Sequence, residues 1–256
     1  APADEEAESI WKDVTGFSSD RIIRCGAKDN FWQMGDTGPC GPCSELHYCL
    51  GIDDVDPRTF GEEPAADGRG WFELWNLVFM QFERHVDGRM ESLPAPSIDT
   101  GAGLERIAVV QQGVLSNYDT DLLRPIVDLA SEISGKRYRA SQTDDDISMR
   151  VIADHARTTA FLIAEGVMPD KQKREYVLRR VMRRAIRHGH RLGIEDPFLH
   201  QVALEVVAAM GDDVLVGAPG FDDAFLMVDV GRVVDDELRQ ELAQAVSNGS
   251  LRPAEG

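Results

Sequence analysis

The spacing of apolar residues changes near residue 118, and this change restricts the fold more than any other feature of the sequence. Before it, SELHYC (44–49) alternates apolar and polar residues, whereas WFELWNLVFMQF (71–82) is apolar on both faces. The first pattern is typical of a half-exposed strand and the second of a strand inside a sheet. After residue 118, apolar residues recur at helical spacing. Strands followed by helices predict an α+β fold with a domain boundary near residue 118.

Turn and capping residues predict where the individual elements begin and end. Asp87-Gly88 predicts a hairpin between 71–82 and a strand at 89–94. The Gly/Pro-rich segment 34–43 (MGDTGPCGPC) is expected to be a loop, and TGAG (100–103) a tight turn. A further strand is expected at 21–25. The expected helices cover residues 6–14, 104–112 (closed by Gly113), 122–134, 147–165 (closed by Gly166), 174–192, 197–210 and 234–246.

Composition excludes several classes of protein. The 256 residues are 43% hydrophobic, which is enough for a sizeable core and excludes collagen, a disordered acidic chain and a disulfide-dense mini-protein. No apolar run approaches the length of a membrane span, and the acidic first residues do not resemble a secretory signal. Four cysteines favour a reducing, cytoplasmic location. The sequence does not begin with Met, so it is expected to be a piece of a longer protein.

Positive charge is concentrated in one segment of an otherwise acidic chain. The formal net charge is −18, yet the window 171–191 holds nine Lys or Arg and a single acid, Glu175. Within the expected helix at 174–192, apolar residues (177, 178, 181, 182, 185 and 186) and arginines (179, 180, 183, 184 and 187) repeat on opposite faces. A solvated helix face usually mixes charges of both signs. This almost purely basic face therefore predicts binding to a phosphate backbone.

The cysteines of Cys40-Gly41-Pro42-Cys43 allow three interpretations. A thioredoxin-like redox site needs a strand before the motif and a helix after it, and neither is expected here. A metal site would combine Cys40, Cys43, His47 and Cys49, whose spacing is tight for zinc. The favoured interpretation is a rigid active-site loop in which the thiols have no chemical role.

Two further positions suggest ligand contacts. Gly101-Ala102-Gly103-Leu104-Glu105-Arg106 resembles a dinucleotide fingerprint but has Arg in place of the last glycine. Two interpretations stay open for this segment. It is either an ordinary strand–turn–helix with a surface Arg, or a site where the glycines permit close backbone approach to a nucleotide and Arg106 binds a triphosphate. On the strand at 71–82, period two places Asn76 beside Val78 on one face. A buried amide needs a hydrogen-bond partner, which is either a structural bridge or a ligand.

Several long segments together resemble the alanyl-tRNA synthetases, a family of class II aminoacyl-tRNA synthetases. They run in the family's order from about residue 4 to about residue 211. The segments are DNFWQMGDTGPCGPCSE, FELWNLVFMQF, LPAPSIDTGAGLERIA, NYDTDLL, RVIADHAR and YVLRRVMRRAIRHGHRLG. The resemblance implies that residues 1–118 are part of a class II antiparallel catalytic domain, with motif 3 at 97–106. Residues 119–210 would be a helical domain for the tRNA acceptor stem, and 211–256 a divergent acidic tail.

The resemblance also implies roles for individual residues. Alanine would be bound by Trp32, Asn76, Val78, Asp99 and Gly101, with Asp99 pairing with the ammonium group. ATP would be bound, together with Mg²⁺, by Gly101, Gly103 and Arg106. Arg106 and Asp99 are therefore the expected catalytic residues. The residues expected to bind tRNA(Ala) are Lys171, Lys173, Arg174, Arg179, Arg180, Arg183, Arg184 and Arg187.

The sequence departs from the family in three respects. Motifs 1 and 2 are expected upstream of residue 1, supplied by a missing N-terminal segment or another chain, so this chain is expected to be an incomplete portion of the ligase. The family's zinc pattern is broken at Leu50 and Asp53. Lys171 stands where an Asn is expected before the basic helix. Two alternatives therefore stay open: a non-catalytic RNA-binding paralogue, and an amino-acid ligase with another acceptor.

Overall fold

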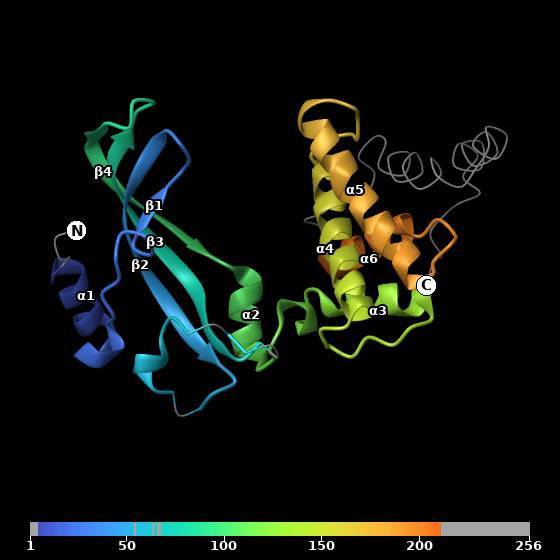
Figure 1. Cartoon of the computed structure of the whole chain (residues 1–256), viewed down its shortest axis with the longest axis horizontal. Helices are drawn as coiled ribbons and strands as arrows, with labels where there is room; N and C mark the ends of the chain where they lie inside the picture. Colours follow the sequence, from blue (N-terminus) through green and yellow to red (C-terminus); the bar gives the residue numbers. More distant parts are fainter. Residues whose placement is uncertain (1–4, 54, 63, 66–67, 211–256) are drawn as a thin grey trace. The chain divides into compact units, whose positions relative to one another are not determined.

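The computed structural model describes residues 5–53, 55–62, 64–65 and 68–210, and these residues form two compact units. The division falls between Asn117 and Tyr118. In Figure 1 the strands all lie before this point, together with two helices, whereas the residues described after it form helices without strands. The expected helix at 234–246 and the rest of the tail lie outside the described residues.

The first unit is built on a four-stranded antiparallel sheet in the order β1-β2-β3-β4. Its strands are β1 (Phe31–Gln33), β2 (Gly38–Leu50), β3 (Gly70–Arg84) and β4 (Met90–Ala102). Its helices are α1 (Glu5–Thr15) and α2 (Leu104–Gln112), with short 3₁₀ turns at η1 (Ser19–Arg21) and η2 (Pro57–Thr59). Together with the helices of the second unit, this sheet confirms the predicted α+β class.

Strands β3 and β4 form the predicted hairpin, and both extend further than the sequence pattern indicated. Two backbone hydrogen bonds close the turn at Asp87-Gly88. The amide of His85 donates to the carbonyl oxygen of Arg89, and the amide of Gly88 donates to that of His85. The tight turn predicted at TGAG was wrong. Long β3 offers partners for Thr100, Gly101 and Ala102, so β4 stays extended to Ala102 and the chain turns only at Gly103.

The segment CGPC lies in a strand, so the predicted loop there was wrong. β2 begins at Gly38 and lies between β1 and β3, because both neighbours offer backbone groups to pair with it. The glycine is required by a close approach: a Cβ at Gly41 would lie 1.8 Å from the carbonyl oxygen of Phe79. A register shift between Cys40 and Cys43 accommodates this crowding.

Two other strand predictions needed correction. The strand predicted at 21–25 is not formed, because the segment has no pairing partner among the described strands; its first residue, Arg21, belongs to η1 instead. β3 has the predicted interior position, between β2 and β4. It is nevertheless not buried on both faces, since only Val78 and Met80 are buried along its length. The apolar composition therefore predicted the strand correctly but overestimated how many of its side chains are buried.

Helices α1 and α2 form where the sequence predicted helices. α1 is tied to the sheet by the indole of Trp11, whose Nε1 donates to Ser44 Oγ on β2 over 2.6 Å. α2 ends at Gly113, whose φ of 66° lets the chain leave the helix in the left-handed conformation.

The second unit is helical throughout the part that the structure describes. After the 3₁₀ turn η3 (Asn117–Asp119), it contains α3 (Arg124–Ser134), α4 (Asp144–Ala164), α5 (Lys173–Leu192) and α6 (Leu199–Met210). α4 packs against α3, α5 and α6 around one apolar cluster. Gly189 permits a close contact there, because a Cβ on it would lie 2.3 Å from the Phe198 ring. The four predicted helices are confirmed, with starts shifted by one to three residues.

Candidate functional site

The sheet brings four of the predicted site residues onto one face. Asn76 on β3 is paired with Gly101 on β4, and Val78 is paired with Asp99. Directly paired residues have side chains on the same face, and the two rows are two residues apart along each strand. Diagonal neighbours such as Asn76 and Asp99 therefore have Cα atoms about 7 Å apart. This separation is within the length of a ligand as small as an amino acid.

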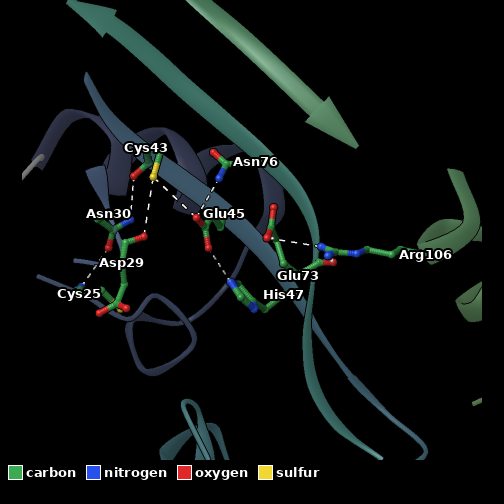
Figure 2. Close-up of polar contacts among 9 residues, drawn as sticks. All are labelled: Cys25, Asp29, Asn30, Cys43, Glu45, His47, Glu73, Asn76 and Arg106. Atoms are coloured by element: carbon green, nitrogen blue, oxygen red, sulfur yellow. Dashed lines mark hydrogen bonds and ion pairs between the residues drawn. The ribbon is translucent and has the colours of Figure 1, made fainter. Parts of the chain in front are cut away.

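Asn76 uses its amide to bridge strands β2 and β3. Its Nδ2 donates to Glu45 Oε1 over 2.8 Å (Figure 2). Its Oδ1 is buried and has no hydrogen-bond partner in the structure. The structural bridge predicted for this amide is therefore formed by its nitrogen. The ligand contact stays a prediction, and the oxygen, which is left without a donor, is the atom available for it.

The surface beside Gly101 is open. A Cβ on Gly101 would meet no atom within 4 Å, so neighbouring side chains do not require glycine at this position. A Cβ on Gly103 would lie 3.2 Å from the side chain of Arg106, which is tighter than an ordinary contact, so Arg106 would have to shift slightly. Asp99 and Gly101 are both exposed.

Arg106 lies in the first turn of α2 and reaches back to the sheet. Its Nη1 donates to the carbonyl oxygen of Glu73 over 2.8 Å and lies 3.4 Å from Glu73 Oε2 (Figure 2). The side chain is 44% exposed, so part of the guanidinium remains open to solvent. Its predicted contact with the ATP phosphates stays a prediction.

Trp32 is more distant from this face than the other predicted pocket residues. It lies on β1 opposite Gly41, and β2 separates β1 from β3. The indole is 37% exposed. Its place in the alanine pocket also stays a prediction.

The cysteine environment contradicts the redox interpretation. All four cysteines are free, and Cys40 and Cys43 are buried within a strand rather than placed at a helix N-terminus. Burial raises the pKa of the Cys40 thiol. Burial, with the nearby charge of Glu45, raises the pKa of Cys43 to about 11. These thiols are therefore protonated at neutral pH and poorly suited to exchange chemistry.

The four residues considered for zinc are not gathered at one point. Cys40 and Cys49 are nine residues apart on extended β2, a separation of roughly 30 Å at the usual rise of a strand. The Nε2 atom of His47 lies 2.9 Å from Glu45 Oε2, so it contacts this carboxylate rather than a cysteine. Across the described part of the chain, no three His, Cys, Asp or Glu side chains lie close enough to hold a metal ion. The donor set does not fit zinc.

The arginines of α5 form an exposed basic face. Leu178, Met182, Ala185 and Ile186 are buried against the core, as predicted. Val177 is 57% exposed, so its predicted place on the apolar face was wrong; it lies about 100° around the helix from Leu178. The exposed basic residues of this segment are Lys171, Lys173, Arg174, Arg180, Arg183, Arg184, Arg187 and Arg191, while Arg179 is half-buried.

Several polar residues that organise the sites were missed by sequence reasoning. Glu45 contacts Asn76, His47 and Cys43, and Glu73 contacts Arg106. Asn30 donates from Nδ2 to the Cys43 carbonyl over 2.7 Å and accepts from the Cys25 amide over 3.2 Å. Period-two alternation from Cys43 into SELHYC places Glu45 on one face with Cys43, and this was the available signal. Nothing local in the sequence indicated Glu73 or Asn30.

A comparison with protein families identifies the chain. The model of the family described as tRNA synthetases class II (A) matches residues 1–215. The chain belongs to this family. This class II membership agrees with the antiparallel sheet of the first unit.

Curated relatives of this class II chain are named alanine–tRNA ligase. The protein from Sorangium cellulosum (strain So ce56) is 70% identical over 212 residues, which are 82% of this chain and 23% of the relative. Those from Anaeromyxobacter sp. (strain Fw109-5) and Acidithiobacillus ferridurans are 57% and 53% identical, and the matches cover 82% and 81% of this chain. The chain spans about a quarter of the length of these relatives. None of the described helices has the length and apolar character needed to span a membrane.

Proposed function

We propose that this chain carries the alanine-binding face and the motif 3 arginine of an alanine–tRNA ligase. The observation that carries the proposal is the shared sheet face of Asn76, Val78, Asp99 and Gly101, in a chain 70% identical to a protein of that name. The open surface at Gly101 leaves room for a substrate beside this face. The sequence resemblance assigns the same residues to alanine.

The proposed reaction has two steps. An oxygen of the alanine carboxylate attacks the α-phosphorus of ATP, and pyrophosphate leaves with its electron pair, giving alanyl-adenylate. A hydroxyl of the terminal tRNA ribose then attacks the alanyl carbonyl, and AMP leaves. Mg²⁺ enters with ATP as part of the substrate. In this scheme Asp99 orients the ammonium group and Arg106 stabilises phosphate charge, so both act through positioning and electrostatics.

In the same proposal, the helical unit binds the acceptor stem of tRNA(Ala). Support comes from the exposed arginines on one face of α5, in a chain whose overall charge is −18. A phosphate backbone has one favourable docking surface on such a chain. Lys171, which lies just before α5, and Lys173, its first residue, would extend that surface.

The first test measures alanine-dependent ATP–pyrophosphate exchange by the 256-residue chain, with serine and glycine as competing substrates. Exchange that prefers alanine would support the proposal directly. The second test replaces the matching segment of the Sorangium cellulosum ligase with this chain's segment and measures the same exchange. We expect the chimera to exchange with alanine, and its Asp99→Ala variant to lose at least 100-fold in kcat/KM because the ammonium loses its counter-ion.

A folded chimera without exchange would overturn the proposal. If such a chimera still bound an RNA hairpin with a steep salt dependence, the non-catalytic RNA-binding paralogue would be the better description. Circular dichroism of the chimera and the parent ligase separates loss of activity from loss of folding.

A further inference from the structure

Glu45 occupies the centre of the face that carries the proposed alanine site. It lies on β2 directly opposite Asn76, which is itself opposite Gly101 on β4. Its side chain is 21% exposed, so the carboxylate is only partly solvated. A partly buried carboxylate is stable when donors surround it, and Glu45 has three such neighbours.

The two carboxylate oxygens of Glu45 have different partners (Figure 2). Oε1 accepts from Asn76 Nδ2 over 2.8 Å and lies 3.7 Å from Cys43 Sγ. Oε2 lies 2.9 Å from His47 Nε2. His47 is in turn held by an edge-to-face contact with the Phe60 ring, at 4.9 Å between centroids. The carboxylate is therefore held from both sides and has little freedom to rotate.

This arrangement decides which end of the Asn76 amide is left for a ligand. A carboxylate accepts hydrogen bonds and does not donate them, so it selects the amide nitrogen of Asn76. The amide oxygen, Oδ1, then becomes the unpaired acceptor, as observed. An ammonium group only donates, so it is complementary to that oxygen and to the Asp99 carboxylate. With the amide reversed, its nitrogen would face the ligand instead of its oxygen. An ammonium group cannot accept a hydrogen bond from that nitrogen.

We propose that Glu45 is a positioning residue of the amino-acid site, which sets the polarity of Asn76 while His47 holds Glu45 in place. The inference rests on the proposed function. It assigns to Glu45 no contact with substrate, because its role is exerted through Asn76. A residue of this kind affects recognition of the amino acid and leaves recognition of ATP unchanged.

The test uses the chimeric ligase described above, with Glu45→Ala and Glu45→Gln and with Glu91→Gln as a matched control on β4. Glu91 contacts His85 and Arg89 at the far end of the hairpin. In Glu45→Ala we expect the KM for alanine to rise at least tenfold, with the KM for ATP changed less than twofold. Glutamine can pair with either end of the amide, so Glu45→Gln should raise the alanine KM only about twofold if both orientations are equally populated. Glu91→Gln should change neither constant.

A double-mutant cycle with Asn76→Ala tests whether Glu45 acts through Asn76. The two substitutions should be strongly non-additive, because removing the amide leaves Glu45 nothing to orient. An active chimera in which Glu45→Ala leaves the alanine KM unchanged, or raises both KM values equally, would overturn this inference alone. Additive effects would overturn it as well. An unmodified chimera that is folded but inactive would instead overturn the proposed function, and the role of Glu45 with it.

Discussion

Gly41 and Gly101 lie on β2 and β4 of the same sheet but are glycine for different reasons. At Gly41 the Phe79 carbonyl leaves no space for a side chain. At Gly101 there is space, and the backbone is not in the left-handed region that favours glycine. Folding therefore explains the glycine at 41. The glycine at 101 has no such steric reason, and close approach of a substrate to its backbone stays a prediction.

We predict that Gly101→Ala mainly affects activity, whereas Gly41→Ala mainly affects stability. Gly101→Ala should change the free energy of unfolding by less than about 0.5 kcal/mol, as is usual at open surface positions. In the chimera it should raise the alanine KM at least fivefold by occupying substrate space. Gly41→Ala should cost about 1–3 kcal/mol because of overpacking. Urea denaturation measures the free energy of unfolding, and ATP–pyrophosphate exchange kinetics measure the alanine KM. An unchanged alanine KM in Gly101→Ala would exclude close approach of the substrate to this glycine.

Helix α5 combines a buried apolar face with an exposed basic one, and the two faces have separate roles. The buried face anchors the helix to α4 and includes His188, whose Nδ1 lies 3.0 Å from Ser148 Oγ on α4. The exposed arginines contribute little to folding, since surface charges rarely affect stability by more than a few tenths of a kcal/mol. Substitutions on the buried face should therefore affect stability, and substitutions on the basic face should affect RNA binding.

On the basic face, we predict that Arg183→Gln with Arg187→Gln weakens RNA binding and its salt dependence. Loss of two phosphate contacts should reduce the slope of log K against log salt by about 1.5. Arg137→Gln with Arg139→Gln removes the same charge from exposed positions outside α5. Fluorescence anisotropy of a labelled acceptor-stem hairpin across a KCl series gives both slopes. Equal effects of the two pairs would show that net charge, rather than this face, governs binding.

On the buried face, we predict that His188 makes stability fall at mildly acidic pH. Burial, followed by the charges of Arg191, Arg184, His155 and Arg187, holds its pKa below the ordinary 6.5. As the pH falls below 6.5, the unfolded chain takes up the proton first, so stability decreases until the pH passes the lowered pKa of the folded state.

Substitution by asparagine tests this pH dependence. His188→Asn should cost about 1–2 kcal/mol at pH 8 through loss of the Ser148 bond, and should flatten the decline in stability below pH 6.5. Urea midpoints from far-UV circular dichroism provide the measurement, with exposed His190→Asn as the control. If stability declined just as steeply with falling pH in His188→Asn, a titratable group other than His188 would be its cause.

Across the molecule, burial of apolar side chains is unevenly distributed between the two units. In the helical unit one cluster of buried side chains joins α3, α4, α5 and α6. In the sheet unit, the buried cluster around Val78 and Met80 is small, and large side chains such as Trp75, Ile98 and Leu104 are substantially exposed. The hydrophobic contribution to stability scales with buried apolar area, so the helical unit should be the more stable of the two.

We predict two unfolding transitions, with the sheet unit unfolding at the lower urea concentration. The four tryptophans, at 11, 32, 71 and 75, all lie in the sheet unit, while most helical residues lie in the other. Tryptophan fluorescence should therefore show a lower midpoint than circular dichroism at 222 nm. Coincident midpoints would show that the chain unfolds as one cooperative body.

The sequence by itself determined the α+β class, the order of most elements and the basic face of α5. These follow from local periodicity and capping residues, which act within a few residues along the chain. It also placed Asn76 and Val78 on one face, because alternation along a single strand is sufficient for that. The motif resemblance added Asp99 and Gly101, whose roles stay predictions.

Tertiary structure decided what depends on partners distant in the chain. The CGPC segment is a strand because β1 and β3 pair with it, and residues 21–25 are not a strand because no strand pairs with them. The register of β3 with β4 placed Asp99 and Gly101 beside Val78 and Asn76. The register of β2 placed Glu45 against Asn76, a contact between residues 31 positions apart. Pairing of distant backbone groups leaves no local pattern in the sequence, so only the folded chain reveals these contacts.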